Sequence, residues 1–250
     1  MRKSFSDHFS AVSSSYAKFR PTYPAELYSW LASLTPDHAA AWDCAAGSGQ
    51  ASVDLAAHFD RVIATDASQA QIDTAVAHPR VDYRVASAEA SGLPERSVDL
   101  VTVAQALHWF EFDAFYDEVR RVLKPAGVLA AWSYGVATVE GGDVDAIAQR
   151  FYRETVGPYW PPETAIVEAG YRTLPFPFEE IEPPPFAMTA RWTLPQLLGY
   201  FGSWSATARY IAMNGKDPTL DLMQQLAPFW GGPERIRTVT WRIALRAGRS

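Results

Sequence analysis

Two apolar runs that each end in an aspartate, with a loop of small residues after the first, constrain this fold most. The first run ends at Asp43, residues 45–49 are all Ala, Gly or Ser, and a helical pattern begins at Gln50. The second run ends at Asp66. A loop of small residues lets the backbone approach a ligand, and a carboxylate at the next strand tip can hold both hydroxyls of a ribose. We therefore expect a nucleoside-type cofactor at the carboxyl ends of a parallel sheet.

Two cofactor classes use such an arrangement, and the spacing alone does not separate them. A nicotinamide dinucleotide site has the pattern Gly-x-Gly-x-x-Gly and a carboxylate about 20 residues later. Gly47 and Gly49 match, but Ser52 stands at the third position. S-adenosylmethionine has no phosphates and needs a close backbone with a polar anchor for its methionine end, which Asp43 suits better. A turn with incidental acids is the alternative without a ligand. A Walker phosphate loop is excluded, because no Gly-Lys-Ser/Thr follows.

Helix and strand patterns alternate from about residue 25 to residue 134, which favours a parallel sheet. The clearest helix is 112–123, ended by Lys124 and Pro125. After residue 135 we expect helices over 143–156 and within 193–212. The expected strands are 40–44, 62–66, 82–85, 98–104, 128–133, 178–182 and 236–246.

Four blocks in order resemble the class I S-adenosylmethionine-dependent methyltransferases. They are the loop after Asp43, residues 81–89, the Leu-Pro-x-x-x-x-Asp-Leu-Val pattern of 93–101, and Arg-Val-Leu-Lys-Pro-Ala-Gly at 121–127. The flanks look like the small-molecule branch similar to trans-aconitate methyltransferase, through residues 19–24, 106–110 and 204–205.

The chain departs from the family pattern in the loop and after the third strand. Ala45 and Ala46 stand where the family usually has glycine, and Ser87 stands where it commonly has an aspartate for the adenine amino group. Alanine can follow a tight turn when φ stays negative, so we expect the loop to survive. The neighbouring Ala88 amide and Glu89 are expected to compensate for Ser87.

The resemblance implies an α/β, Rossmann-like fold with a seven-stranded, mostly parallel sheet, helices on both faces and a small helical cap. It divides the chain into three parts. Residues 1–135 hold the N-terminal helices and the cofactor-binding core, residues 136–235 hold substrate-capping segments with a sixth strand, and residues 236–250 add a last antiparallel strand.

The resemblance also implies site residues. The cofactor-binding candidates are Tyr16, Arg20, Asp43, Ala45, Gly47, Gly49, Asp66, Ala67, Ser87, Ala88, Glu89, Ala104 and Gln105. The substrate-binding candidates are His108, Trp109, Tyr159, Trp160, Trp204 and Arg209. Core packing is an equal alternative for Trp109, and Tyr159, Trp160 and Trp204 are of types that are more often core than ligand contacts. The first helix, with Phe9 and Phe19 on one stripe, is expected to close over the cofactor.

The implied reaction is methyl transfer to a small-molecule acceptor. A carboxylate acceptor needs no base, whereas a hydroxyl or phenol must lose a proton, for which His108 is the catalytic candidate. The sequence shows no partner to orient His108, and we expect a carboxylate. The alternatives are a nicotinamide-dependent oxidoreductase and a non-catalytic cofactor-binding member of the fold.

Composition limits the remaining functions. A net charge of −6 and a pI near 5.4 argue against general binding of nucleic acid. The single cysteine, Cys44, cannot form an internal disulfide, and no Cys/His cluster predicts a metal. No apolar run reaches membrane-spanning length or forms a signal core. We expect a cytoplasmic enzyme that does not bind membranes; its oligomeric state is left open.

Overall fold

The computed structural model describes residues 21–232 and 234–249, which fall into two compact units. We call residues 23–134, 165–186 and 243–249 the core unit, and the described residues of 21–22, 135–164 and 187–242 the helical unit. The boundaries expected from the sequence, at 135 and 236, assign residues 165–186 to the capping segments. The structure includes them in the core unit instead.

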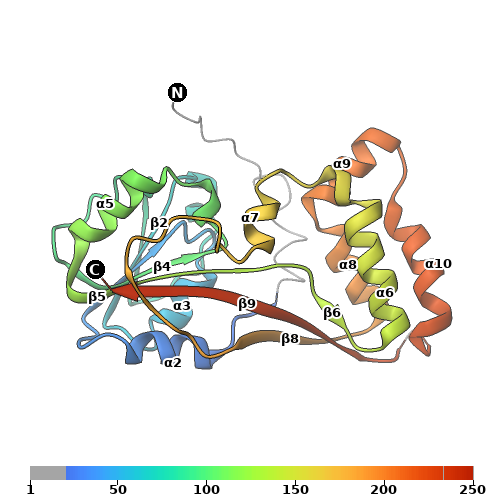
Figure 1. Cartoon of the computed structure of the whole chain (residues 1–250), viewed down its shortest axis with the longest axis horizontal. Helices are drawn as coiled ribbons and strands as arrows, with labels where there is room; N and C mark the ends of the chain where they lie inside the picture. The colour runs from blue at the N-terminus through green and yellow to red at the C-terminus, as the bar shows by residue number, and fades with distance from the viewer. Residues whose placement is uncertain (1–20, 233, 250) are drawn as a thin grey trace. The chain divides into compact units, whose positions relative to one another are not determined.

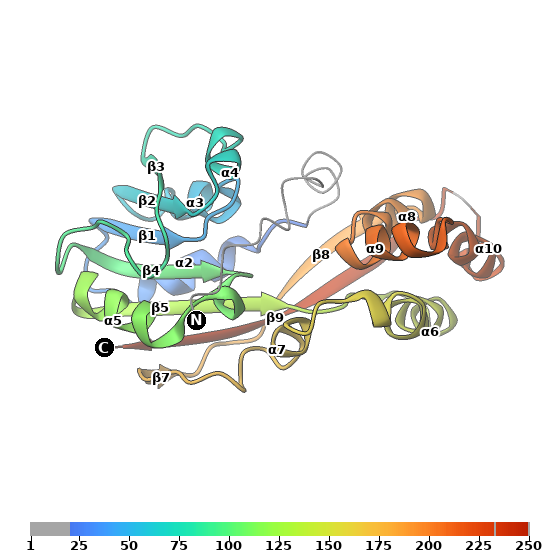
Figure 2. The ribbon, with the colours of Figure 1, turned by 90° about the horizontal axis from the view of Figure 1, so that it is seen from above.

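A sheet of parallel strands forms the centre of the core unit (Figure 2). Its order is β3-β2-β1-β4-β5, and β9 pairs antiparallel with β5. Because the chain order reverses between β1 and β4, the carboxyl ends of these two strands form a topological switch point, where ligands of such sheets bind. The strands are β1 (Ala40–Cys44), β2 (Arg61–Asp66), β3 (Val81–Val85), β4 (Val98–Ala104), β5 (Leu123–Tyr134) and β9 (Arg237–Arg249).

Continuous apolar sequence explains why the central strands are buried on both faces. Six of the seven residues of β4 are buried, and Trp42 and Trp132 on the neighbouring strands are fully buried. The indole Nε1 of Trp42 donates to Thr65 Oγ1 at 2.8 Å, so this buried N–H is satisfied across the β1–β2 pair. The α/β fold with a mostly parallel sheet is thus confirmed.

Helices lie on both faces of this sheet (Figure 1). On one face lie α2 (Ala25–Ser33) and α3 (Gln50–Leu55), and on the other lies α5 (Phe112–Val122). The short α4 (Gln69–Asp73) follows β2. The stripe expected on α5 is confirmed, since its buried residues include Phe115, Tyr116, Val119 and Val122.

The strand after α5 begins earlier than the sequence predicts. We expected 128–133, whereas β5 starts at Leu123 and pairs with Val98 of β4 before a shift of register. The sequence at 124–127, Lys-Pro-Ala-Gly, is typical of a turn, and Ala126 has a φ of +63°. The irregularity is a bulge in the strand, and bulges use the same residue types as turns.

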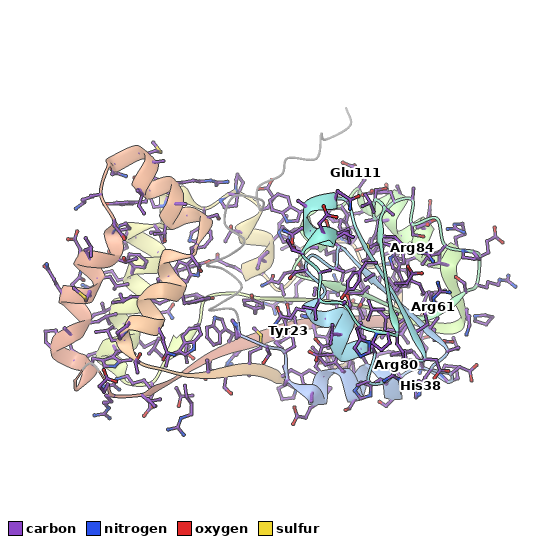
Figure 3. All side chains as sticks on the ribbon, turned by 180° about the vertical axis from the view of Figure 1, so that it is seen from behind. Tyr23, His38, Arg61, Arg80, Arg84 and Glu111 are labelled. Atoms are coloured by element: carbon purple, nitrogen blue, oxygen red, sulfur yellow. The ribbon has the colours of Figure 1, made fainter. Side chains whose placement is uncertain are left out.

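The edge strand β3 carries charged side chains on its surface (Figure 3). Asp82 Oδ2 accepts from Arg84 Nη2 of the same strand at 2.5 Å and from Arg61 Nη2 of β2 at 2.6 Å. These groups lower the pKa of Asp82, the hydrogen bond from Arg84 most. Charged residues at an exposed sheet edge oppose pairing with another chain.

The helical unit contains α6 (Gly142–Arg150), α8 (Leu194–Gly202), α9 (Ser205–Asn214) and α10 (Pro218–Trp230). A π-helix (Phe151–Thr155) continues α6, so the helix expected over 143–156 exists with a changed hydrogen-bond pattern. A short 3-10 helix, η3 (Gly157–Tyr159), follows. The sequence analysis missed α10, whose pattern contains Pro228 and exposed Leu220, Met223 and Phe229.

Three short strands complete the described sheet, which has nine strands in all. The main path, β3-β2-β1-β4-β5-β9-β6, has seven strands, of which β6 was not expected. The strand expected at 178–182 is β7, which lies off this path and pairs with β9, as β8 does. The short strands are β6 (Thr138–Val139), β7 (Glu179–Ile181) and β8 (Phe186–Trp192), and a one-turn helix, α7 (Thr164–Glu168), precedes β7. β9 contributes residues to both units.

A buried carboxylate connects three strands of the core unit, and we predict that its removal is costly. Asp99 is 2% exposed; it accepts from Ala40 N at 2.9 Å and from Lys124 Nζ at 2.8 Å. Asp99→Ala should lower the free energy of unfolding by about 2–4 kcal/mol, because it leaves a partly buried amide and a partly buried ammonium group without their acceptor. Urea denaturation measures this. The control Asp117→Ala, whose side chain is 80% exposed beside Arg120, should change it by less than about 0.5 kcal/mol. Equal effects of the two substitutions would contradict the prediction.

Candidate active site

The carboxylate of Asp66 binds the loop that follows β1. Its Oδ2 accepts from the backbone N–H of Gly47 at 2.9 Å, and its Oδ1 accepts from that of Ser68 at 2.8 Å. A further bond from Ala46 N to Thr65 O, 2.9 Å long, holds the same loop against β2. Asp66 is half-buried, and each carboxylate oxygen can accept more than one hydrogen bond. The position of Asp66 was predicted, whereas its bond to the loop was not.

Glycine is required in the loop because another residue fills the space beside it. Gly49 has a φ of +83°, and a Cβ there would lie 2.1 Å from the hydroxyl oxygen of Tyr83. Tyr83, on β3, donates that hydroxyl to the carbonyl of Val76 at 2.9 Å, and Val76 N donates to Ser48 O at 3.2 Å. Tyr83 is thus a loop-supporting residue that the sequence analysis missed, because it lies 34 positions from Gly49.

Asp43 is held by hydroxyl groups in the interior. It is 1% exposed, and it accepts from Ser52 Oγ at 2.5 Å and from Thr102 Oγ1 at 2.9 Å. Burial raises the pKa of this carboxyl to about 6, although both hydroxyls act in the opposite direction. In this arrangement Asp43 connects the start of α3 to β4. Its contact with a cofactor stays a prediction.

Two residues at the switch point have left-handed backbone, and the expectation of a negative φ at Ala45 is wrong. Ala45 has a φ of +57°, as does Gln105. They directly follow the adjacent strands β1 and β4. Such a conformation costs a non-glycine residue roughly 1–2 kcal/mol. Gln105 is held by bonds of 2.9 Å from its backbone N–H to Trp132 O and from its side-chain Nε2 to Tyr134 O. Backbone strain concentrates at functional sites.

The other cofactor candidates also follow the carboxyl ends of strands. Ala67 is exposed after β2; Ser87, Ala88 and Glu89 follow β3; and Ala104 is the last residue of β4. Because these strands are parallel, the described candidates share one edge of the sheet. Contacts of these residues with a cofactor stay a prediction. Tyr16 and Arg20, like the rest of the expected first helix, lie outside the described residues.

His108 lies in a 3-10 turn, η1 (Leu107–Trp109), directly after β4. Its Nδ1 is 3.2 Å from the hydroxyl oxygen of Tyr171, and its ring is 4.7 Å from that of Trp109 between centroids. The partner of His108 that the sequence does not show is therefore Tyr171. Tyr171 is 63 residues later in the chain, where no local pattern indicates the pair. It is fully buried, and burial raises the pKa of its hydroxyl well above the ordinary value.

The backbone at Tyr171 is unusual for an aromatic residue. Gly170 and Tyr171 both have left-handed backbone, with φ of +60° and +61°, and for a bulky residue this conformation is a genuine outlier. Arg246 of β9 holds the turn, because its Nη1 donates to the carbonyls of Tyr171 at 3.0 Å and Leu174 at 2.9 Å. The structure thus keeps Tyr171 in place at a cost of roughly 1–2 kcal/mol.

The remaining substrate candidates meet within the helical unit. The rings of Trp160 and Trp204 are 5.4 Å apart, and Arg209 Nη1 donates to the carbonyl of Tyr159 at 3.2 Å. Trp204 is buried and also packs on Phe201 at 4.5 Å, so it has a core role. Within the described residues, the buried indole Nε1 of Trp160 has no hydrogen-bond partner. A buried donor without a partner is a candidate for ligand binding.

The described residues contain neither a cluster that could bind a metal nor a helix that could span a membrane. In residues 21–232 and 234–249, no group of three or more His, Cys, Asp or Glu side chains could hold a metal ion. Over the same ranges, no helix is long and apolar enough to cross a membrane. Cys44 is a buried free thiol, and burial raises its pKa well above the ordinary value.

Comparison with known proteins identifies the family. Residues 42–131 match the family described as methyltransferase domain. A protein of Dictyostelium discoideum named as a methyltransferase is 39% identical over 225 residues, which are 89% of this chain and 86% of the relative. A solved structure from Anaeromyxobacter dehalogenans, named as a type II methyltransferase, is 49% identical with a TM-score of 0.89, and the match covers 92% of this chain and 98% of that one.

The chain belongs to the class I S-adenosylmethionine-dependent methyltransferases. The class inferred from the sequence is thereby confirmed, and the nicotinamide-dependent oxidoreductase and the non-catalytic protein are set aside. A Mycobacterium tuberculosis protein named as an uncharacterized methyltransferase is 31% identical over 160 residues, which are 60% of this chain and 65% of the relative.

The residues at the sheet edge of this methyltransferase fit its cofactor. Gly47 presents backbone without a side chain, as a close ligand requires, and the nearest atom to a Cβ there would be Gln71 Oε1 at 3.8 Å. Asp66 is a half-buried carboxylate that can accept from hydroxyls in addition to its two backbone bonds. The hydroxyl of Ser52, at the third position of the dinucleotide pattern, is engaged with Asp43.

We predict that Asp43 makes the stability of the methyltransferase depend on pH. The folded state holds this proton up to about pH 6, whereas the unfolded chain loses it near the ordinary pKa of 3.8. The folded state therefore binds more protons between these values, and the contribution of Asp43 to stability falls as the pH rises through this range. Asp43→Asn cannot titrate, so its free energy of unfolding relative to the wild type should increase by about 1–3 kcal/mol from pH 4 to pH 7.

Urea denaturation at both pH values measures this difference. Asp73→Asn is a matched control, because Asp73 is exposed and accepts a local hydrogen bond from Gln69 of the same helix, so this variant should show no such trend. A difference between Asp43→Asn and the wild type that stays constant with pH would refute the prediction.

We also predict that Asp66 anchors the cofactor. Asp66→Ala removes a ribose acceptor and releases the Gly47 amide, and charge-assisted bonds are worth about 1.5–3 kcal/mol each. The affinities for S-adenosylmethionine and its demethylated product should fall at least tenfold in calorimetry. Asp66→Asn, which retains an acceptor for Gly47, should lose less, and Asp73→Ala should lose nothing. An unchanged dissociation constant in Asp66→Ala would leave Asp66 with a structural role only; NAD serves as the ligand that should not bind.

Proposed function

We propose that this methyltransferase transfers a methyl group to a small-molecule acceptor, and that the acceptor is a carboxylate. The observation that carries the choice is the partner of His108. A histidine that acts as a general base is commonly oriented by a carboxylate, which stabilises the imidazolium that forms. The partner of Nδ1 here is the neutral, buried hydroxyl of Tyr171. A reaction that needs no proton removal suits this arrangement.

Two further features support a carboxylate. The sequence blocks at residues 19–24 and 106–110 resemble the branch similar to trans-aconitate methyltransferase. Arg209 has five N–H donors, of which Nη1 donates to the carbonyl of Tyr159. A guanidinium group binds a carboxylate through two parallel hydrogen bonds, so the remaining donors of Arg209 suit an anion.

The roles of the residues follow from the chemistry of the cofactor. S-adenosylmethionine supplies a methyl group on a sulfonium, which is electrophilic without further activation. The chain therefore needs to bind, to orient and to exclude water. We assign cofactor binding to Asp66 and the loop at Gly47 and Gly49. We assign acceptor contacts to His108 and Trp109 in the core unit.

We predict that a carboxylate acceptor gives a rate that is nearly constant from about pH 6 to pH 8, because such an acceptor has no proton to lose. Tritium-labelled S-adenosylmethionine, tested against a panel of small mono-, di- and tricarboxylates with phenols as the comparison, identifies the acceptor. With that acceptor, His108→Ala should lower kcat/KM by at most about tenfold, as the loss of one hydrogen bond does.

The loss of a general base costs about 10²–10⁴-fold. The proposal is therefore overturned by a decrease of that size in His108→Ala while cofactor affinity is retained, together with a wild-type rate that rises through the histidine range. Methylation of phenols but of no carboxylate would overturn it as well.

A further inference from the structure

We infer that Tyr171 is a positioning residue that fixes the tautomer of His108. In this assignment the Tyr171 hydroxyl donates to Nδ1, so the neutral imidazole carries its proton on Nε2. His108 can then donate a hydrogen bond from Nε2 but cannot take a proton there. The tautomer follows from the described contacts alone. Its use toward a carboxylate acceptor rests on the proposed function.

The direction of the hydrogen bond follows from the single proton of the phenol. Tyr171 is fully buried, and a buried hydroxyl needs an acceptor for its proton. Among the described residues, the hydrogen bond of this hydroxyl is the one with His108. His108 Nδ1, 3.2 Å away, provides the acceptor. The opposite tautomer would place an N–H donor on the oxygen and would leave the phenol proton to find another acceptor in the interior.

The surrounding structure holds the phenol in this position. Gly170 and Tyr171 form a left-handed turn. Glycine is required at its first position, because a Cβ at Gly170 would lie 2.6 Å from that of Ala244. Arg246 donates to the carbonyl of Tyr171, and its Nη2 forms an ion pair with Glu180 at 2.6 Å. Upstream, Ser133 Oγ donates to the carbonyl of Val167 at 3.3 Å. The turn is therefore attached to β5 and β9, which is consistent with a strained conformation kept for function.

The second partner of the imidazole limits its rotation. The ring of His108 packs against Trp109 with centroids 4.7 Å apart, and against Tyr171 with centroids 6.0 Å apart. A histidine that packs against two aromatic rings and whose Nδ1 is hydrogen-bonded retains little freedom to flip. Orientation of a ring nitrogen by a hydrogen bond on the other nitrogen is the general means by which proteins select a histidine tautomer.

Nitrogen NMR tests the tautomer without cofactor or acceptor. The full chain is labelled with ¹⁵N-histidine and measured at about pH 8.5, where an unperturbed imidazole is neutral. The chain has 5 histidines, and the signals that disappear in His108→Asn assign His108. We expect the wild type to show the proton on Nε2 and a nonprotonated Nδ1. In Tyr171→Phe, which keeps the buried ring, the two ¹⁵N shifts should move toward each other, because both tautomers then exchange.

Tyr116→Phe is the matched control. Tyr116 is also buried in the core unit and donates its hydroxyl to the carbonyl of Pro175 at 2.7 Å, so the substitution removes a comparable hydrogen bond. It should leave the His108 shifts at their wild-type values. A wild-type proton on Nδ1, or Tyr171→Phe shifts equal to those of the wild type, would overturn the inference.

Kinetics with the acceptor found by the labelled-cofactor panel test the use of the donor. Tyr171→Phe should lower kcat/KM by about two- to tenfold, while calorimetry gives the wild-type affinity for S-adenosylmethionine. Tyr116→Phe should leave kcat/KM within twofold of the wild type. If the panel yields no carboxylate acceptor, the proposed function fails and the NMR result still decides the tautomer. An equal loss of kcat/KM in both variants would overturn the positioning role.

Discussion

The bond between Asp66 and the amide of Gly47 is the interaction on which the cofactor edge depends. A parallel sheet brings the tips of β1 and β2 side by side, but it leaves the loop between β1 and α3 without ladder partners. Asp66 supplies that partner, at 2.9 Å, from the neighbouring strand. The same carboxylate therefore shapes the loop and is the ribose acceptor that we propose, so the proposal links the affinity for the cofactor to the conformation of the loop through one side chain.

The sequence predicts those parts of the core unit in which local pattern and tertiary structure agree. The bounds expected for the strands 40–44 and 98–104 coincide with β1 and β4, because both are short apolar runs between clear turn signals. The sequence does not predict the start of β5, where a bulge uses turn residues, or α10, whose apolar residues are partly exposed. In these elements long-range pairing overrides the local signal.

The residues of the candidate site also divide into those that the sequence predicts and those that it does not. Residues that follow or end a strand, such as Gly49 and Asp66, were predicted from the sequence because the apolar runs show where the strands end. Tyr83 and Tyr171 were not found, because each acts on a residue tens of positions away, through a contact that only the folded chain creates. The φ of Ala45 was wrongly expected to be negative. The family has glycine at this position, which indicates a left-handed backbone, whereas the alanine of this chain does not indicate that conformation.

Asp43 and Asp66 lie at the same edge of the sheet, and their environments, not their residue type, determine which of them suits a ligand. Asp43 is the last residue but one of β1, Asp66 is the last residue of the neighbouring parallel strand β2, and the sequence predicts a cofactor contact for both. Asp43 is buried, its oxygens are taken by Ser52 and Thr102, and desolvation raises its pKa to about 6. Asp66 is half-buried and its bonds come from backbone amides, which leave lone pairs toward solvent. A ribose needs an accessible acceptor, so of the two carboxylates Asp66 suits the ligand and Asp43 suits the support of the loop.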